Sequence, residues 1–267
     1  MKNVTLGRYI PLDSFFHKLD PRSKICAMFA ILIAIFIPAG WIGYAIIGAV
    51  IVSCVFIAKL QLDFIIKAMK PMLMMMVFLF VINLLVVKTG DPLFTIGPLT
   101  VYVDALTQTA YIAVRLVLMI MLTTLLTATT KPMDMTLGIE DLLAPFEKLK
   151  VPTHDIAMMI SLALRFIPTL IDEADRILKA QSSRGVDFEN GKFGEKITAI
   201  VSLIVPMFVS CFQRADDLAD AMEARGYVVG AKRVRYKTLK FHGGDYVVLI
   251  VSNLILVGMI LIWIFVK

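Results

Sequence analysis

Two arginines, 41 residues apart, stand in the same local setting. Each follows a small residue and precedes a glycine. A guanidinium offers forked N–H donors that match a carboxylate, and a small neighbour lets a partner surface approach closely. Glycine suits the position after a helix, because it adopts the left-handed conformation at little cost. The pattern therefore predicts two helix tips that present a cation to an acidic groove on a partner. The residues concerned are Ser183, Arg184, Gly185, Ala224, Arg225 and Gly226.

The elements that must position these arginines are two long helices, expected over about 153–184 and 194–225. Apolar or small residues recur in both at alternating steps of four and three, as in a heptad seam. The second seam repeats the first after 41 residues without a gap, and both reach their arginine at the same phase. The seam residues singled out here are Ile160, Ala163, Ile167, Ala174, Val201, Ile204, Phe208 and Ala215.

Ordinary helix termination could also explain the two tips. Arginine near a helix C-terminus suits the negative end of the macrodipole, and glycine is a common helix stop. The repetition at the same seam phase favours a shared function over coincidence. Two equal tips on one chain suit a partner present twice, either a homodimer or a pseudo-symmetric heterodimer.

Composition indicates that the helices belong to an integral membrane protein. Apolar residues make up 59% of the 267 residues and charged ones only 18%, unevenly placed. We expect an all-α fold with about five transmembrane helices, at roughly 22–38, 41–58, 68–87, 105–128 and 244–267. The N-terminal membrane part would be 1–130. The charge-rich segment 131–243 would form a cytoplasmic domain of long amphipathic helices, on or beside the membrane, before the final helix.

Lysine and arginine predict the orientation. The N-terminal tail, the loop after the second expected span and the segment 131–243 together hold 24 of the 27 basic residues. Only Lys88 and Lys267 fall on the other side, and Arg115 lies within a span. By the positive-inside rule we expect a multi-pass plasma-membrane protein with a cytoplasmic N-terminus. The net charge of +6 follows from this asymmetry, and basic residues spread among acids argue against nucleic-acid binding.

Motifs of catalysis and metal binding are absent from the sequence. It contains no G-x-x-x-x-G-K-[ST] loop and no G-x-S-x-G elbow, and its three histidines lie far apart. We therefore expect a non-catalytic chain with no metal site. Arg115 is the one ionisable residue near the middle of an expected span. It could contact another membrane subunit, brace the fold internally or snorkel to an interface.

Four stretches resemble the T component of energy-coupling factor (ECF) transporters. They are EARG at 223–226, SSRG at 182–185, LDPRSK at 19–24 and AVRLVLMIMLTTLLTATTKP at 113–132. The resemblance implies a membrane scaffold that links two ABC ATPases, which bind ATP and magnesium, to a substrate-binding membrane S component. It also implies that Arg184 and Arg225, with their neighbours, dock into the ATPases. Ser183 departs from the alanine of the family motif, which makes its tip the less certain one.

The resemblance makes vitamin uptake the expected function, with no cofactor bound by this chain. A nickel- or cobalt-dedicated T component shares the same motifs and stays open, as does a self-sufficient secondary transporter. A methionine cluster where the third span begins could be a sliding contact for S components or plain lipid-facing filler. The possible S-component contacts are Arg115, Met72, Met75 and Met76. We read LDPRSK first as a structural anchor, with Asp20 capping its helix.

Overall fold

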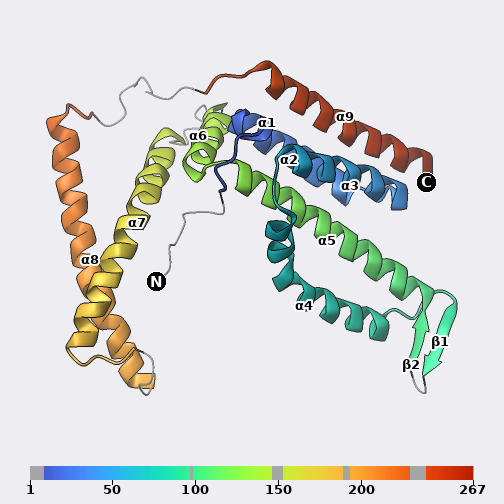
Figure 1. Ribbon diagram of the computed structural model, residues 1–267, viewed down its shortest axis with the longest axis horizontal. Coiled ribbons are helices and arrows are strands. Elements are labelled where there is room, and N and C mark those ends of the chain that lie inside the picture. Colours follow the sequence, from blue (N-terminus) through green and yellow to red (C-terminus); the bar gives the residue numbers. More distant parts are fainter. Residues whose placement is uncertain (1–8, 97–98, 146–152, 189–192, 229–238, 267) are drawn as a thin grey trace. The chain divides into compact units, whose positions relative to one another are not determined.

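The computed structural model describes residues 9–96, 99–145, 153–188, 193–228 and 239–266, and these residues are helical apart from one hairpin (Figure 1). The helices are α1 (Phe15–Lys18), α2 (Pro21–Phe36), α3 (Gly40–Ile57), α4 (Leu62–Val86), α5 (Val103–Thr129), α6 (Pro132–Leu143), α7 (Thr153–Ser183), α8 (Phe193–Ala224) and α9 (Gly243–Val266). Strands β1 (Pro92–Ile96) and β2 (Leu99–Tyr102) pair antiparallel between α4 and α5. The predicted all-α class is confirmed, with this hairpin as a small addition.

Five of the described helices are long and apolar enough to cross a membrane, and four of them are expected spans, while α8 takes the place of the expected span at 22–38. The candidates are Gly40–Ile57, Asp63–Val86, Val103–Thr129, Phe193–Ala224 and Gly243–Phe265. Helix α2 has only 16 residues, about 24 Å against a hydrocarbon core of about 30 Å. Helix α8 was expected on or beside the membrane. It joins the candidates because its residues 197–213 carry no charge and four of its five acids follow in the second half.

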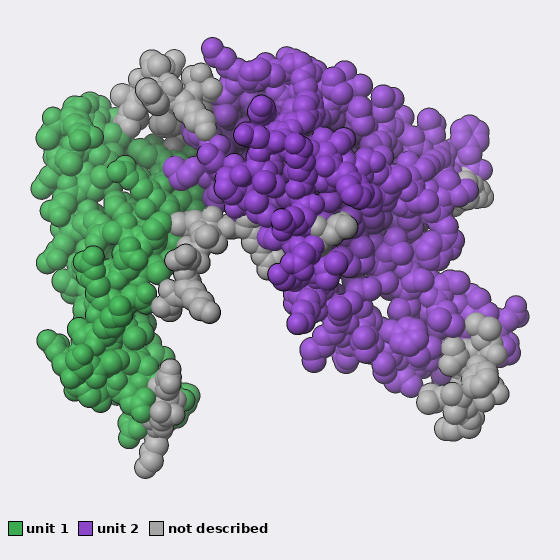
Figure 2. Space-filling view, in the orientation of Figure 1, with its two compact units in different colours: residues 1–6, 154–238 green, residues 7–153, 239–267 purple. Residues whose placement is uncertain are grey.

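The chain divides into two compact units (Figure 2). One contains α7 and α8 and lies within His154–Thr238, and the other comprises Gly7–Thr153 and Leu239–Lys267. The expected border at 130/131, between a membrane part and a cytoplasmic domain, stays a prediction, whereas contacts divide the chain at 153/154. The reason is that α6 packs on α2. A side chain at Gly138 of α6 would place its Cβ 3.0 Å from Cβ of Pro21, so glycine permits the close approach.

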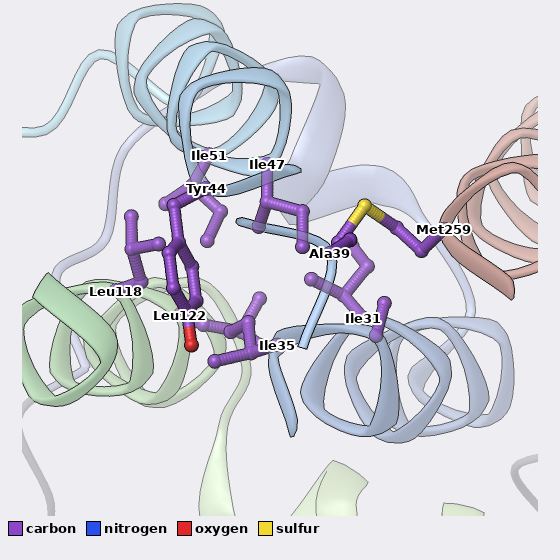
Figure 3. Packing of buried hydrophobic residues seen from close by; sticks show 10 residues of the cluster. Ile31, Ile35, Ala39, Tyr44, Ile47, Ile51, Leu118, Leu122 and Met259 are labelled. Atoms are coloured by element: carbon purple, nitrogen blue, oxygen red, sulfur yellow. The ribbon is translucent and has the colours of Figure 1, made fainter. Parts of the chain in front are cut away.

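The core of the larger unit lies where α2, α3, α5 and α9 meet (Figure 3). Ile35 and Ile47 are fully buried there, and Met259 of α9 packs beside them. Gly43 on α3 lets α9 come close, because a Cβ at this position would lie 2.7 Å from Cε of Met259. A second cluster joins the C-terminal ends of α3 and α5 to the start of α4. Its buried members are Val55, Ala58, Leu60, Ile65, Leu125 and Ala128.

Candidate docking site at two helix tips

The first tip ends α7. The backbone N–H of Gly185 donates to the carbonyl of Ser182 at 3.0 Å, and that of Val186 donates to the carbonyl of Gln181 at 3.1 Å. These two bonds form a Schellman motif, which satisfies carbonyls that a helix end otherwise leaves open. Gly185 has φ +87°, the left-handed conformation that the motif requires. Arg184 is therefore the last residue before the chain turns, and its side chain projects from the helix end.

The second tip, at the end of α8, repeats this geometry residue for residue. The N–H of Gly226 donates to the carbonyl of Glu223 at 2.8 Å, and that of Tyr227 to the carbonyl of Met222 at 3.0 Å. Gly226 has φ +76°. Every partner lies 41 positions after its counterpart in the first tip. The sequence repeat is thus also a repeat of backbone conformation at both helix ends.

Both tips are open to a partner. Arg184 and Arg225 are exposed, as are Ser183 and Ala224 beside them. Within the part of the chain that the structure describes, neither guanidinium forms a hydrogen bond or ion pair. A Cβ at Gly185 or at Gly226 would meet nothing within 4 Å. Each tip can therefore donate forked hydrogen bonds to an acceptor on another chain without first breaking an internal bond.

Ser183 differs from Ala224 less than its hydroxyl suggests. The Oγ of Ser183 donates to the carbonyl of Lys179, one turn earlier, at 3.0 Å. This internal bond occupies the hydroxyl hydrogen and holds the oxygen against its own helix. To an approaching partner, Ser183 is thus a small residue, as Ala224 is.

The tips lie at opposite ends of the α7–α8 pair. The hydroxyl of Tyr227, just beyond the second tip, contacts Sδ of Met158 at 3.7 Å, near the start of α7. Arg184 follows Met158 by 26 residues, which corresponds to about 39 Å along a helix. In Figure 1, α7 and α8 run in opposite directions and cross. Two tips this far apart cannot enter one small pocket.

The predicted seams meet only in part. The shallow pocket between the two helices is lined on α7 by Met159, Leu162 and Phe166, each one position before a predicted seam residue, and by Leu170. Of the eight seam residues singled out from the sequence, only Ala215 lines this pocket. Several others stay about half exposed within the described chain, and Ile167 and Ala174 are partly buried elsewhere. The exposed ones are Ile160, Ala163, Val201, Ile204 and Phe208.

Arg115 braces the membrane unit internally, which is one of the three roles left open by the sequence. Its Nη2 and Nε donate to the hydroxyl of Tyr44 at 2.8 and 3.1 Å, joining α5 to α3. Its guanidinium carbon also lies 5.5 Å from the ring centroid of Phe36. The methionines expected at an S-component contact lie on α4, where Met75 is exposed and Met72 and Met76 are partly exposed. The described contacts of Arg115 are with Tyr44 and Phe36 and not with these methionines.

A buried polar cluster around LDPRSK contains a residue that the sequence reasoning missed. Asp20 caps α2 as predicted, accepting the N–H of Arg22 at 2.9 Å. Asp245, fully buried at the start of α9, accepts the N–H of Asp20 at 2.8 Å and lies 2.6 Å from Oγ of Ser23. The sequence did contain a signal for Asp245, because it is a lone acidic residue at the start of the last apolar run. Asp245 thus fixes α9 to the start of α2.

Lys24 is buried in the same region. Its Nζ donates to the carbonyl of Thr129 at 3.1 Å and lies 3.3 Å from Oγ1 of Thr130, so it ties α2 to the end of α5. No group of three or more histidine, cysteine or acidic residues that could hold a metal occurs among the described residues.

Comparison with known proteins shows the family of this chain. The family model for CbiQ, described as cobalt transport protein, matches residues 13–236. The energy-coupling factor transporter transmembrane protein EcfT of Bacillus subtilis (strain 168) is 42% identical over 260 residues, which cover 97% of this chain and 98% of that protein. EcfT of Thermosediminibacter oceani is 41% identical, with 98% of each chain covered, and EcfT of Clostridium kluyveri is 44% identical, with 92% of each covered. The chain therefore belongs to the EcfT family of energy-coupling factor transporter transmembrane proteins.

Proposed function

We propose that this non-catalytic EcfT subunit is the membrane scaffold of an importer and that its two tips dock on two cytoplasmic ABC ATPases. The observation that carries the proposal is the matched pair of helix ends, each with an exposed arginine that has no partner in the described chain. Their separation along α7 suits two grooves on two ATPase subunits better than one groove on a single subunit. The ATPases, rather than this chain, bind ATP and magnesium.

The energy-coupling step follows from this placement. When ATP binding and hydrolysis change the spacing of the two ATPases, their grooves pull on Arg184 and Arg225. Helices α7 and α8 carry this movement to a membrane S component that binds the substrate. The half-exposed apolar residues of α8, such as Val201, Ile204 and Phe208, offer a contact surface for that subunit or for lipid.

The orientation and location belong to the same proposal. With the N-terminus in the cytoplasm, the basic residues that precede α2 and those of α7 and α8 lie on the ATPase side of the plasma membrane. Although α8 is long and apolar enough to cross a membrane, in this proposal it lies with α7 on the ATPase side, so that both tips meet soluble partners.

A vitamin is the proposed substrate, with metal import as the second candidate. The relatives that align over nearly the full chain are ECF transporter subunits, whereas the matching family model carries the description cobalt transport protein. Uptake of tritiated riboflavin with a riboflavin-specific S component supports the first candidate. Uptake of radioactive cobalt that depends on the same ATPases supports the second. Uptake by the purified chain alone in liposomes would instead identify a self-sufficient transporter.

Replacement of the tip arginines tests the docking proposal. Arg184→Ala, Arg225→Ala and the double variant are co-expressed with the ATPases, and the ATPase retained by the tagged chain is measured. Exposed arginines of α7 that precede its tip provide matched controls in Arg165→Ala and Arg176→Ala. We expect each single variant to lose part of the ATPase, the double variant to lose nearly all of it, and the controls to lose none. Full retention by the double variant would refute the docking proposal.

A further inference from the structure

Arg22, at the start of α2, contacts three separate segments of the chain. Its Nη2 and Nε bind the two carboxylate oxygens of Asp20, at 2.9 and 3.1 Å. Its Nη1 lies 3.4 Å from Oδ2 of Asp141 on α6. Its guanidinium carbon lies 4.3 Å from the ring centroid of Phe241, just ahead of α9. One side chain therefore holds together α2, α6 and the segment that leads into α9.

The two segments that Arg22 joins to α2 are those through which the chain enters and leaves the α7–α8 unit. We call the segment at Asp141 the entry root and the segment at Phe241 the exit root. Asp141 precedes the first residue of that unit, His154, by 13 positions, and Phe241 follows its last residue, Thr238, by three. The chain thus leaves the membrane unit shortly after Asp141 and returns to it shortly before Phe241. Both roots meet at the same guanidinium.

The contacts around Arg22 are firm because the groups are largely removed from water. The side chain of Arg22 is 18% exposed, that of Asp141 21% and that of Asp20 only 1%. A bidentate arginine–carboxylate pair and a stacked aromatic ring gain strength in such a setting. Gly138 also brings α6 so close to α2 that a Cβ there would lie 3.4 Å from the backbone nitrogen of Arg22.

The start of α9 is also fixed to the start of α2 by a second set of hydrogen bonds. Asp245 accepts the backbone N–H of Asp20 and also that of His242, the latter at 2.7 Å. Arg22 and Asp245 together therefore hold both roots on the first turn of α2. Of the two, only Arg22 bridges one root to the other.

We propose that Arg22 is a positioning residue, a clamp that fixes the spacing between the entry root at Asp141 and the exit root at Phe241. The inference rests on the proposed coupling function. A pull on α7 and α8 moves the membrane helices only if their roots do not slide apart. With the clamp released, the roots separate and the movement is lost, so ATP is hydrolysed without matching uptake.

Uptake per ATP hydrolysed tests the clamp in the reconstituted complex of this chain, the ATPases and a riboflavin-specific S component. The variants are Arg22→Gln, Asp141→Asn and Phe241→Leu. The controls are Phe241→Trp, which keeps a ring over the guanidinium, and Lys18→Gln, which removes an exposed nearby charge. We expect the three clamp variants to keep the ATPases and their hydrolysis, while uptake per ATP falls roughly five-fold or more. Both controls should retain the wild-type ratio.

A purely structural role for Arg22 would lower assembly, hydrolysis and uptake together and leave the ratio unchanged. An unchanged ratio in assembled Arg22→Gln and Phe241→Leu complexes would overturn the inference. If Arg22→Gln fails to fold, because Asp20 is left buried without its partner, Phe241→Leu and Asp141→Asn decide the matter. They leave the Asp20–Arg22 pair in place.

A measurement on the chain alone separates this inference from the proposed function. Spin labels are placed at the exposed Ile139 of α6 and Lys240 beside Phe241, after replacement of Cys26, Cys54 and Cys211. We expect a narrow distance distribution in the wild type and a broader one in Phe241→Leu. Equal widths would overturn the clamp even if the ATPases bind. Failure of the wild-type chain to retain the ATPases would overturn only the proposed docking.

Discussion

The hydroxyl of Tyr227 lies 3.7 Å from Sδ of Met158, which places the end of α8 beside the start of α7. This antiparallel arrangement separates Arg184 from Arg225 by nearly the length of a helix. A single chain can therefore engage two partner grooves at once.

Alanine at the tip glycines should weaken ATPase binding. Gly185 and Gly226 have φ +87° and +76°, and a residue with a Cβ loses about 1–2 kcal/mol in this conformation. No neighbour lies within 4 Å, so the cost is conformational rather than a steric clash. We expect Gly185→Ala and Gly226→Ala each to raise the Kd for the ATPases up to about tenfold, measured by surface plasmon resonance. Asparagine tolerates φ above zero better, so the Asn variants should bind more tightly than the Ala variants. Equal binding by the wild type, the Ala variants and the Asn variants would contradict a role for the left-handed turn in docking.

The first tip should bind an ATPase as well as the second, although it has Ser183 where the second has Ala224. Its hydroxyl is bonded to the carbonyl of Lys179, so Ser183→Ala should leave ATPase retention at the wild-type level. Ser183→Leu and Ala224→Leu should each reduce retention, because a large side chain keeps the partner from the guanidinium. A loss in Ser183→Ala would mean that the hydroxyl itself contacts the ATPase.

Removal of the Asp245 carboxylate should destabilise the membrane unit. Asp245→Ala leaves the buried N–H of Asp20 and the partly buried N–H of His242 without their acceptor, and a buried unsatisfied donor costs about 1–3 kcal/mol. For a chain of this size, each kcal/mol lowers Tm by about 2–4 °C. We expect a fall in Tm of several degrees in detergent. The exposed neighbour variant Asn253→Ala provides the control. Equal Tm values for Asp245→Ala and the wild type would show that these bonds contribute nothing net.

The Arg115–Tyr44 contact should appear as an interaction energy between the two positions. Tyr44→Phe removes the acceptor of two hydrogen bonds and leaves its ring in place. The change should lower stability in the wild type and have a smaller effect in an Arg115→Leu background, as a double-mutant cycle measures. Additive effects would contradict the internal brace and favour a contact with another subunit.

Much of the fold could be predicted from the sequence, because long uncharged runs and heptad spacing are local signals. The bounds of α3, α5, α7 and α8 agree with the expected ranges to within one or two residues. The predicted seam residues agree less well with the residues that line the contact between α7 and α8. Spacing alone identifies an apolar stripe but cannot tell which edge of it meets a neighbour, and on α7 the contact with α8 uses Met159, Leu162 and Phe166 instead.

Other features depend on contacts between distant parts of the chain. The place of α6 in the membrane unit follows from Gly138 against Pro21 and from Arg22 against Asp141, pairs more than a hundred residues apart. Asp245 meets Asp20 and Ser23 across 225 and 222 positions. No local pattern encodes such pairings. The tips were predictable because a helix end with arginine and glycine is formed by neighbours in the sequence.

Photo-cross-linking from the two tips tests the central claim most directly. A photoreactive amino acid replaces Ser182 or Glu223, exposed residues two positions before Arg184 and Arg225, and replaces the exposed Arg176 on α7 as a control. In membranes that contain the ATPases, we predict an adduct with an ATPase subunit from each tip position and little from the control. The absence of ATPase adducts from both tips, in a complex that still imports substrate, would contradict the account.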